Sequence, residues 1–66
     1  MGLIKQYQLF ELSMDINAEI KKGMIGVVLE LLDYQTFIAE FVKKDSPNYE
    51  YQGKFTFILT TSDIKL

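Results

Sequence analysis

The sequence contains no cysteine, no histidine and no arginine among its 66 residues. Without cysteine the chain has neither disulfides nor thiolate metal ligands, which excludes a disulfide-stapled secreted miniprotein and makes the cytoplasm the expected location. Without histidine or cysteine it also lacks the usual general base and the most reactive nucleophile. We therefore expect a protein that is not an enzyme and that uses no cofactor and no metal ion.

The charged residues narrow the choice of partner. Nine acidic residues outnumber seven lysines, for a net charge of -2. Guanine readout and phosphate clamping rely on arginine and on clustered positive charge, so weak nucleic-acid binding is the least favoured alternative and a basic protein surface matches better. No stretch approaches the roughly 20 apolar residues of a spanning helix, and residues 1–8 lack a signal-peptide pattern, so no membrane is expected.

Apolar residues, by contrast, are plentiful. They make up 48% of the chain and include five phenylalanines, which is enough for a hydrophobic core. A chain of this length buries only about 60% of the surface that its unfolded form exposes. We expect residues 1–66 to form one small domain.

Alternating apolar residues predict five short strands. The predicted strands span residues 7–12, 24–32, 36–44, 54–61 and 64–66. Their predicted inward residues include Phe10, Leu12, Phe55, Phe57 and Leu59. Residues 13–22 fit neither a helix nor a strand, and we expect a long loop that Ile16 and Ile20 hold in place. A short helix from Asp15 to Lys22 is the alternative, and a polar turn is expected at residues 61–63.

The second and third strands should form a hairpin whose register follows from their apolar residues. The expected inward pairs are Val27 with Phe41, Leu29 with Ala39 and Leu31 with Phe37. In that register paired residue numbers have an even sum, which requires a connection of three residues, Asp33–Gln35, or of five. Five strands without a long helix predict an all-β fold, a small and closed or nearly closed barrel.

The order of these elements resembles that of an SH3-like small barrel. More narrowly, residues 21–30 and 39–41 are similar to the pattern Lys-Lys-Gly-x-x-Gly-x-Val-Val-Glu, then Val-Glu-Phe, of a family of short bacterial domains of unknown function. The matching residues are Phe10 and Leu12, Asp15 and Ile16, residues 21–30 and residues 39–41. The match runs from about residue 8 to residue 66, with Ala39 in place of the family's usual valine and a longer loop after Phe41. The resemblance implies a five-stranded SH3-like barrel and no activity.

Gly23 and Gly26 are interpreted as structural residues. A phosphate-binding loop needs a helix after its glycines and a Lys-Ser/Thr pair, whereas these glycines precede and interrupt a predicted strand. We expect Gly23 to form a turn and Gly26 to permit a sharp bend or bulge.

Two surfaces are candidate protein-binding sites. In the first, Tyr49 and Tyr51 flank Glu50, with Asp45 at the rim, and exposed tyrosines often anchor interfaces. The alternative is that these tyrosines fold back over one end of the barrel. The second surface is the outer face of the predicted hairpin, made up of Val28, Glu30, Leu32, Ile38, Glu40 and Val42. Its aliphatic residues predict an interface, with a second copy of the chain as one candidate occupant, unless residues 13–22 cover them.

Two functions fit these features. The leading hypothesis is a non-catalytic protein-binding module, a small inhibitor such as an immunity or antitoxin-like protein, that occludes a basic surface of its partner. The alternative is an accessory or regulatory subunit whose hairpin face docks onto a larger assembly.

Overall fold

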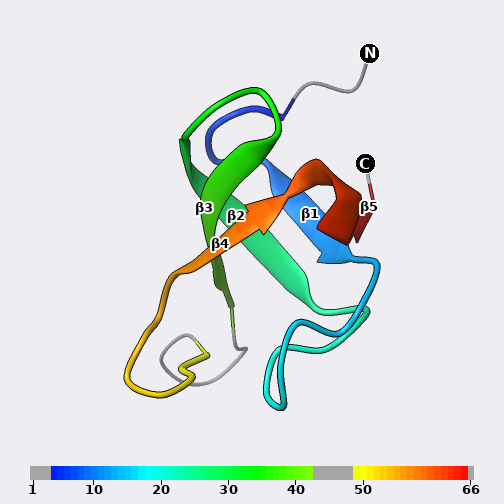
Figure 1. Cartoon of the computed structure of the whole chain (residues 1–66), viewed down its shortest axis with the longest axis vertical. Coiled ribbons are helices and arrows are strands. Elements are labelled where there is room, and N and C mark those ends of the chain that lie inside the picture. Colours follow the sequence, from blue (N-terminus) through cyan, green and yellow to red (C-terminus); the bar gives the residue numbers. More distant parts are fainter. Residues whose placement is uncertain (1–3, 43–48, 66) are drawn as a thin grey trace.

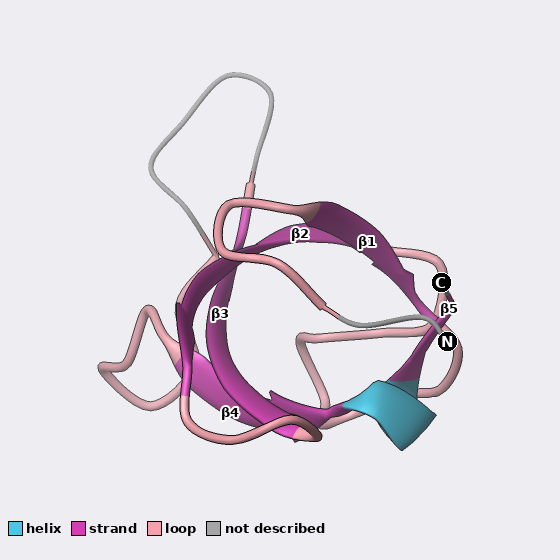
Figure 2. Ribbon diagram, turned by 90° about the horizontal axis from the view of Figure 1, so that it is seen from above, coloured by secondary structure: helices cyan, strands magenta, loops and turns pink. Residues whose placement is uncertain are grey.

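The structure, a computed structural model, describes residues 4–42 and 49–65 of the chain. Five antiparallel strands form one curled sheet, a half-barrel (Figures 1 and 2). They are β1 (Leu9–Leu12), β2 (Ile25–Leu31), β3 (Thr36–Phe41), β4 (Phe57–Thr60) and β5 (Ile64–Lys65), in the spatial order β4-β3-β2-β1-β5. The prediction of an all-β, five-stranded small barrel of the SH3-like kind is confirmed.

A single turn of 3-10 helix, η1 (Thr61–Asp63), joins β4 to β5 where the polar turn is predicted. The Asp63 carboxylate accepts the Thr60 N–H at 2.9 Å, which caps this turn. The alternative helix from Asp15 to Lys22 does not form, because residues 13–22 are a loop. None of the helical structure within the described residues is long and apolar enough to cross a membrane.

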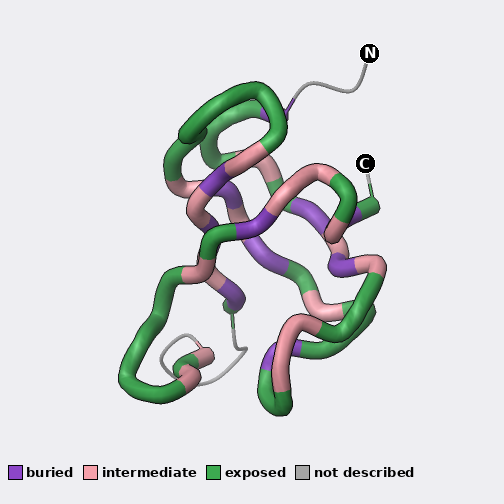
Figure 3. Tube along the Cα trace, viewed as in Figure 1, coloured by how far each residue is buried: buried purple, intermediate pink, exposed green. Residues whose placement is uncertain are grey.

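Buried residues occur on all five strands (Figure 3), and they form one core cluster on the inner side of the curled sheet. Phe10 on β1 packs edge-on against Phe37 and Phe41 on β3, with ring centroids 5.5 and 5.7 Å away. Leu12 and Ala39 are completely buried with them. The inward residues predicted for the first and third strands are therefore confirmed.

The β1–β2 loop adds its own side chains to this core. Ile20 is completely buried, and Ile16 is partly buried against the same cluster. These two residues hold the loop in place as predicted, which explains how a segment without regular structure stays ordered.

The register of β2 against β3 corrects the prediction. Gly26 lies opposite Phe41 and Val28 opposite Ala39, so Gly26 and Val28 face inward in place of Val27 and Leu29. The register then shifts between Val28 and Glu30, which leaves Leu29 as the extra residue of a β-bulge. Beyond the bulge Leu31 does lie opposite Phe37 as predicted, but its side chain is 43% exposed.

The register next to the hairpin connection is as predicted. Leu31 pairs with Phe37, so five residues, 32–36, connect the last pair, which is one of the two lengths expected. Within this connection the Leu32 N–H donates to the Thr36 carbonyl at 2.9 Å. The bulge at Leu29 changes the parity only on the far side from the connection, for the pairs of Gly26, Val27 and Val28.

Gly26 is required by close packing. A Cβ atom built on it would lie 2.6 Å from Cζ of Phe10 and 2.9 Å from the Glu40 carbonyl oxygen. The bulge that was expected there lies at Leu29 instead. Gly23 has a φ of 92° and forms the predicted turn before β2.

β4 is shorter than predicted. Leu59 is buried and the Phe57 ring packs 5.7 Å from that of Phe41, but Phe55 is 45% exposed, so its inward assignment is wrong. The cause is a tight turn just before it, in which the N–H groups of Tyr51 and Lys54 each donate to the other residue's carbonyl. After this turn the chain bends at Phe55 and joins the sheet only at Phe57.

Asp33 fastens the β2–β3 connection. Its Oδ1 accepts the N–H groups of Gln35 and Thr36, each at 2.8 Å. These backbone hydrogen bonds favour the charged carboxylate and hold the pKa of Asp33 below its ordinary value of 3.8. Because the folded pKa is depressed, Asp33 stabilises the fold above its unfolded pKa, and this contribution is lost as pH falls through the folded pKa.

We therefore expect an NMR titration of the Asp33 carboxyl carbon to give a midpoint below 3.8. Asp33→Ala should destabilise the protein at neutral pH, and the difference from wild type should shrink as pH falls through the folded pKa. A midpoint at or above the ordinary value would contradict the capping role.

Candidate functional site

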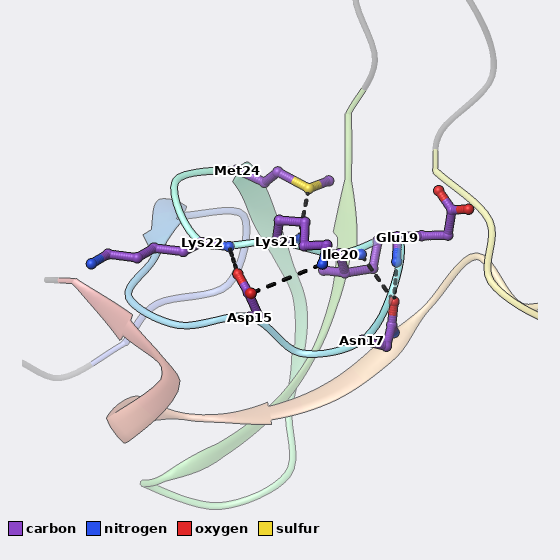
Figure 4. A network of polar contacts seen from close by, with 7 residues as sticks. All are labelled: Asp15, Asn17, Glu19, Ile20, Lys21, Lys22 and Met24. Atoms are coloured by element: carbon purple, nitrogen blue, oxygen red, sulfur yellow. Dashed lines mark hydrogen bonds and ion pairs between the residues drawn. The ribbon is translucent and has the colours of Figure 1, made fainter.

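The polar residues of the β1–β2 loop shape the backbone (Figure 4). Oδ1 of Asn17 accepts the N–H groups of Glu19 and Ile20 at 2.8 and 2.9 Å. Oδ1 of Asp15 accepts the Lys22 N–H at 2.8 Å. These oxygens direct Ile20 into the core, and no group of three or more potential metal ligands occurs within residues 4–42 and 49–65.

The tyrosine segment folds back onto the barrel. Tyr49 is half-buried against the core, and its N–H donates to the Phe41 carbonyl at 3.1 Å. Tyr51 is also half-buried and begins the tight turn that ends at Lys54, whereas Glu50 is exposed. Asp45 lies outside the described residues. Tyr49 thus covers part of the core, which is the alternative that the sequence left open for this segment.

The convex face of the sheet carries aliphatic residues that do not belong to the core. Leu9 on β1 lies beside Val27 on β2, and Val27 lies beside Glu40 on β3. Ile25 is the next outward residue of β2. Val42 follows β3 directly, one position beyond the pair of Gly26 and Phe41, and therefore neighbours Ile25. We name this set, Leu9, Ile25, Val27 and Val42, the outer apolar patch.

The patch is open to solvent in large part. Leu9 is 66% exposed, Val42 51% and Ile25 48%. Residues 13–22 do not cover it, because their anchors, Ile16 and Ile20, pack into the core.

The structure brings together part of the interface predicted for the hairpin. Ile38, Glu40 and Val42 lie on the outer side as expected, and Glu30 is exposed. Leu32 is 47% exposed, but in the connection beyond the sheet. The assignment of Val28 to this outer face is wrong, because Val28 is completely buried opposite Ala39.

Leu9, Ile25 and Val27 were missed for two different reasons. Leu9 could have been found from the sequence, since assigning Phe10 and Leu12 inward leaves Leu9 outward. Ile25 and Val27 could not be found once β2 was assigned the wrong parity, because a shift of one residue exchanges the two faces of a strand.

Acidic groups border the patch. Glu40 on β3 is half-buried beside Val27, and Glu11 on β1 lies beside Ile25 on β2. The one lysine of β5, Lys65, is already engaged, since its Nζ lies 3.2 Å from the Glu11 carboxylate. The arrangement can bury apolar area and accept hydrogen bonds from a basic group opposite Glu40.

A shallow groove lies beside β4. It has a volume of about 580 Å³ and is lined by Ile16, Ile38, Lys54, Thr56, Phe57 and Ile58. Lys54 is the one ionisable residue among the described residues of this lining, and these bring together no pair of groups suited to acid-base chemistry.

No protein-family model, curated protein or solved structure matches this chain. The resemblance to the short bacterial SH3-like domains therefore stays a prediction, and the candidate site rests on the residues described above.

Proposed function

We propose that this protein is a non-catalytic protein-binding module that docks through the outer apolar patch, as an accessory or regulatory subunit of a larger assembly in the cytoplasm. The observation that carries the proposal is the exposure of Leu9, Ile25 and Val42 on one face of the sheet. Contiguous exposed aliphatic side chains rimmed by polar groups are typical of protein interaction sites.

The charges around the patch support a basic partner. Glu40 and Glu11 border the aliphatic residues, and the chain as a whole has a net charge of -2. Charge of one sign around an apolar centre speeds association with an oppositely charged surface and disfavours acidic competitors. The expected partner therefore has an apolar contact surface flanked by lysine or arginine.

The second candidate function is a small inhibitor, of the immunity or antitoxin type, that occludes a basic site with Tyr51 and Glu50. One observation favours it: the exposed Glu50 stands next to a tight turn, whose central residues Gln52 and Gly53 have φ values of 53° and 80°. Two backbone hydrogen bonds between Tyr51 and Lys54 close this turn, so it should lose little conformational freedom when a partner binds.

The affinity of variants for the native partner distinguishes the two candidate functions. The partner would be captured from the cells that produce this chain, identified, purified and titrated by calorimetry. If the outer apolar patch is the interface, Ile25→Asp should weaken affinity by at least about tenfold, because it places a charge in an apolar contact. Tyr51→Ala, the matched control, should leave affinity within about threefold of wild type.

The reverse pattern would support the occluding inhibitor. Wild-type affinity in both variants would reject both interfaces. Circular dichroism of each variant must first show an unchanged fold, so that a loss of affinity reports on the surface itself.

A further inference from the structure

β4 is an edge strand that lacks the usual protection. Within residues 4–42 and 49–65 it stands at one end of the sheet and pairs only with β3. Natural edge strands are protected by charge, by proline or by being very short. The other edge strand, β5, has two residues and carries Lys65, whereas residues 55–61 contain no charged residue and no proline.

Hydrogen bonds of the neighbouring strand show which backbone groups of β4 are free. The Thr36 carbonyl accepts the Leu32 N–H on the β2 side of β3. The N–H and C=O groups of successive residues in a strand point to opposite sides. The backbone groups of Phe37 and Ala39 therefore point toward β4. Their partners are Leu59 and Phe57, so these two residues of β4 exchange hydrogen bonds with β3.

The N–H and C=O of Ile58 consequently point away from β3, toward the open edge. Two further contacts agree with this alternation: the Thr61 N–H donates to Gln35, and the Thr60 N–H donates to the Asp63 carboxylate instead of to β3. Among the described residues, none of the hydrogen bonds outside the strand ladders involves Ile58.

The side chains beside this edge are apolar and accessible. Ile58 is 68% exposed and pairs across the sheet with Ile38 on the same face. The groove of about 580 Å³ runs beside Thr56, Phe57 and Ile58. The edge therefore offers backbone hydrogen bonds and an apolar surface together.

We propose that two copies of the chain pair antiparallel through β4 across a two-fold axis at Ile58. In this register each Ile58 exchanges both of its backbone hydrogen bonds with Ile58 of the second copy. The Thr56 N–H of each copy donates to the Thr60 carbonyl of the other, since the Thr60 N–H is already committed to Asp63. The two sheets join into one, and Ile38 and Ile58 of both copies form a continuous apolar ridge.

Charge favours a second copy over a foreign strand. Residues 55–61 are uncharged, so self-pairing creates no like-charge contacts across the strands. Antiparallel pairing also places the segment before β4, which carries Lys54, at the same end of the interface as the 61–63 turn of the other copy, which carries Asp63. Within the described residues neither Lys54 nor Asp63 forms an ion pair in its own chain. This pairing lies apart from the outer apolar patch and is independent of the proposed function.

Sedimentation equilibrium over a range of concentrations tests the pairing. Wild type should dimerise, and Ile58→Lys should raise the dimer dissociation constant by at least about 100-fold, because the cross-strand contact between the two isoleucines is lost and two lysines face each other. Leu9→Lys is the matched control, since Leu9 is 66% exposed against 68% for Ile58 and lies on β1. It should dimerise like wild type.

A disulfide test remains informative even where a charged variant fails to fold. Paired residues of this hydrogen-bonded type have Cα atoms about 5.5 Å apart, within the roughly 4.4 to 6.8 Å that a disulfide spans. The native chain has no cysteine, so oxidised Ile58→Cys should form a covalent dimer and Leu9→Cys should not. A monomeric wild type, a dimer lost in Leu9→Lys, or equal cross-linking of both cysteine variants would overturn the proposal.

Discussion

Phe41→Ala should lower the free energy of unfolding by roughly 3 to 5 kcal/mol, a large part of the total stability of a chain this short. Phe41 is completely buried, and its ring contacts those of Phe10 and Phe57 at centroid distances of 5.7 Å each. A domain of this size has a total stability of only about 3 to 10 kcal/mol. Urea denaturation followed by circular dichroism measures the loss.

Glu40→Ala is the matched control on the neighbouring position of β3. Its side chain lies on the opposite face of the sheet and is half-buried, and no described hydrogen bond or ion pair holds it. The variant should lose less than about 1 kcal/mol. If Glu40→Ala were the more damaging of the two, the inward and outward residues of β3 would have to be exchanged.

Gly26→Val should destabilise the protein by at least about 3 kcal/mol, at or above the upper end of the usual range for overpacking, although valine is the better strand former. A Cβ atom at Gly26 would lie 2.6 Å from the Phe10 ring, 2.9 Å from the Glu40 carbonyl oxygen and 3.0 Å from the Phe41 ring. The carbonyl belongs to the backbone of β3 and cannot move aside as a side-chain end can. Thermal and urea unfolding should both show the loss.

Two further variants isolate the cause. Gly26→Ala should already be destabilising, because the Cβ atom alone makes these contacts. Gly53→Ala meets no atom within 4 Å, and only its φ of 80° opposes the change, so about 1 to 2 kcal/mol is expected there. An unchanged melting temperature for Gly26→Val would show that the rings of Phe10 and Phe41 do not pack against this glycine.

The two proposed surfaces lie on different parts of the sheet. The outer apolar patch lies on the face of β1 and β2, whereas the dimer uses the edge of β4. A dimer formed through β4 would leave both patches accessible and present two copies of the docking surface. Such a module could bind a symmetric partner with gain in avidity.

Much of the fold follows from local sequence patterns. Alternation in residues 7–12 and 36–41 identifies β1 and β3 and assigns Phe10, Leu12 and Phe41 to the core, because one face of each strand is clearly more apolar. The turn formers at residues 61–63 likewise predict η1. The candidate binding residues were predicted less well: Ile38, Glu40 and Val42 lie on the outer face, but Val28 does not.

By itself, then, the sequence determined the five strands, their order along the chain and the inward face of the strands that alternate. Only the tertiary structure decided which face of β2 is buried. Residues 24–32 are apolar at almost every position, so both faces satisfy the same pattern. What selects Gly26 and Val28 is the space that the Phe10 and Phe41 rings require, together with the bulge at Leu29. Both are contacts between strands far apart in sequence, and no local pattern records them.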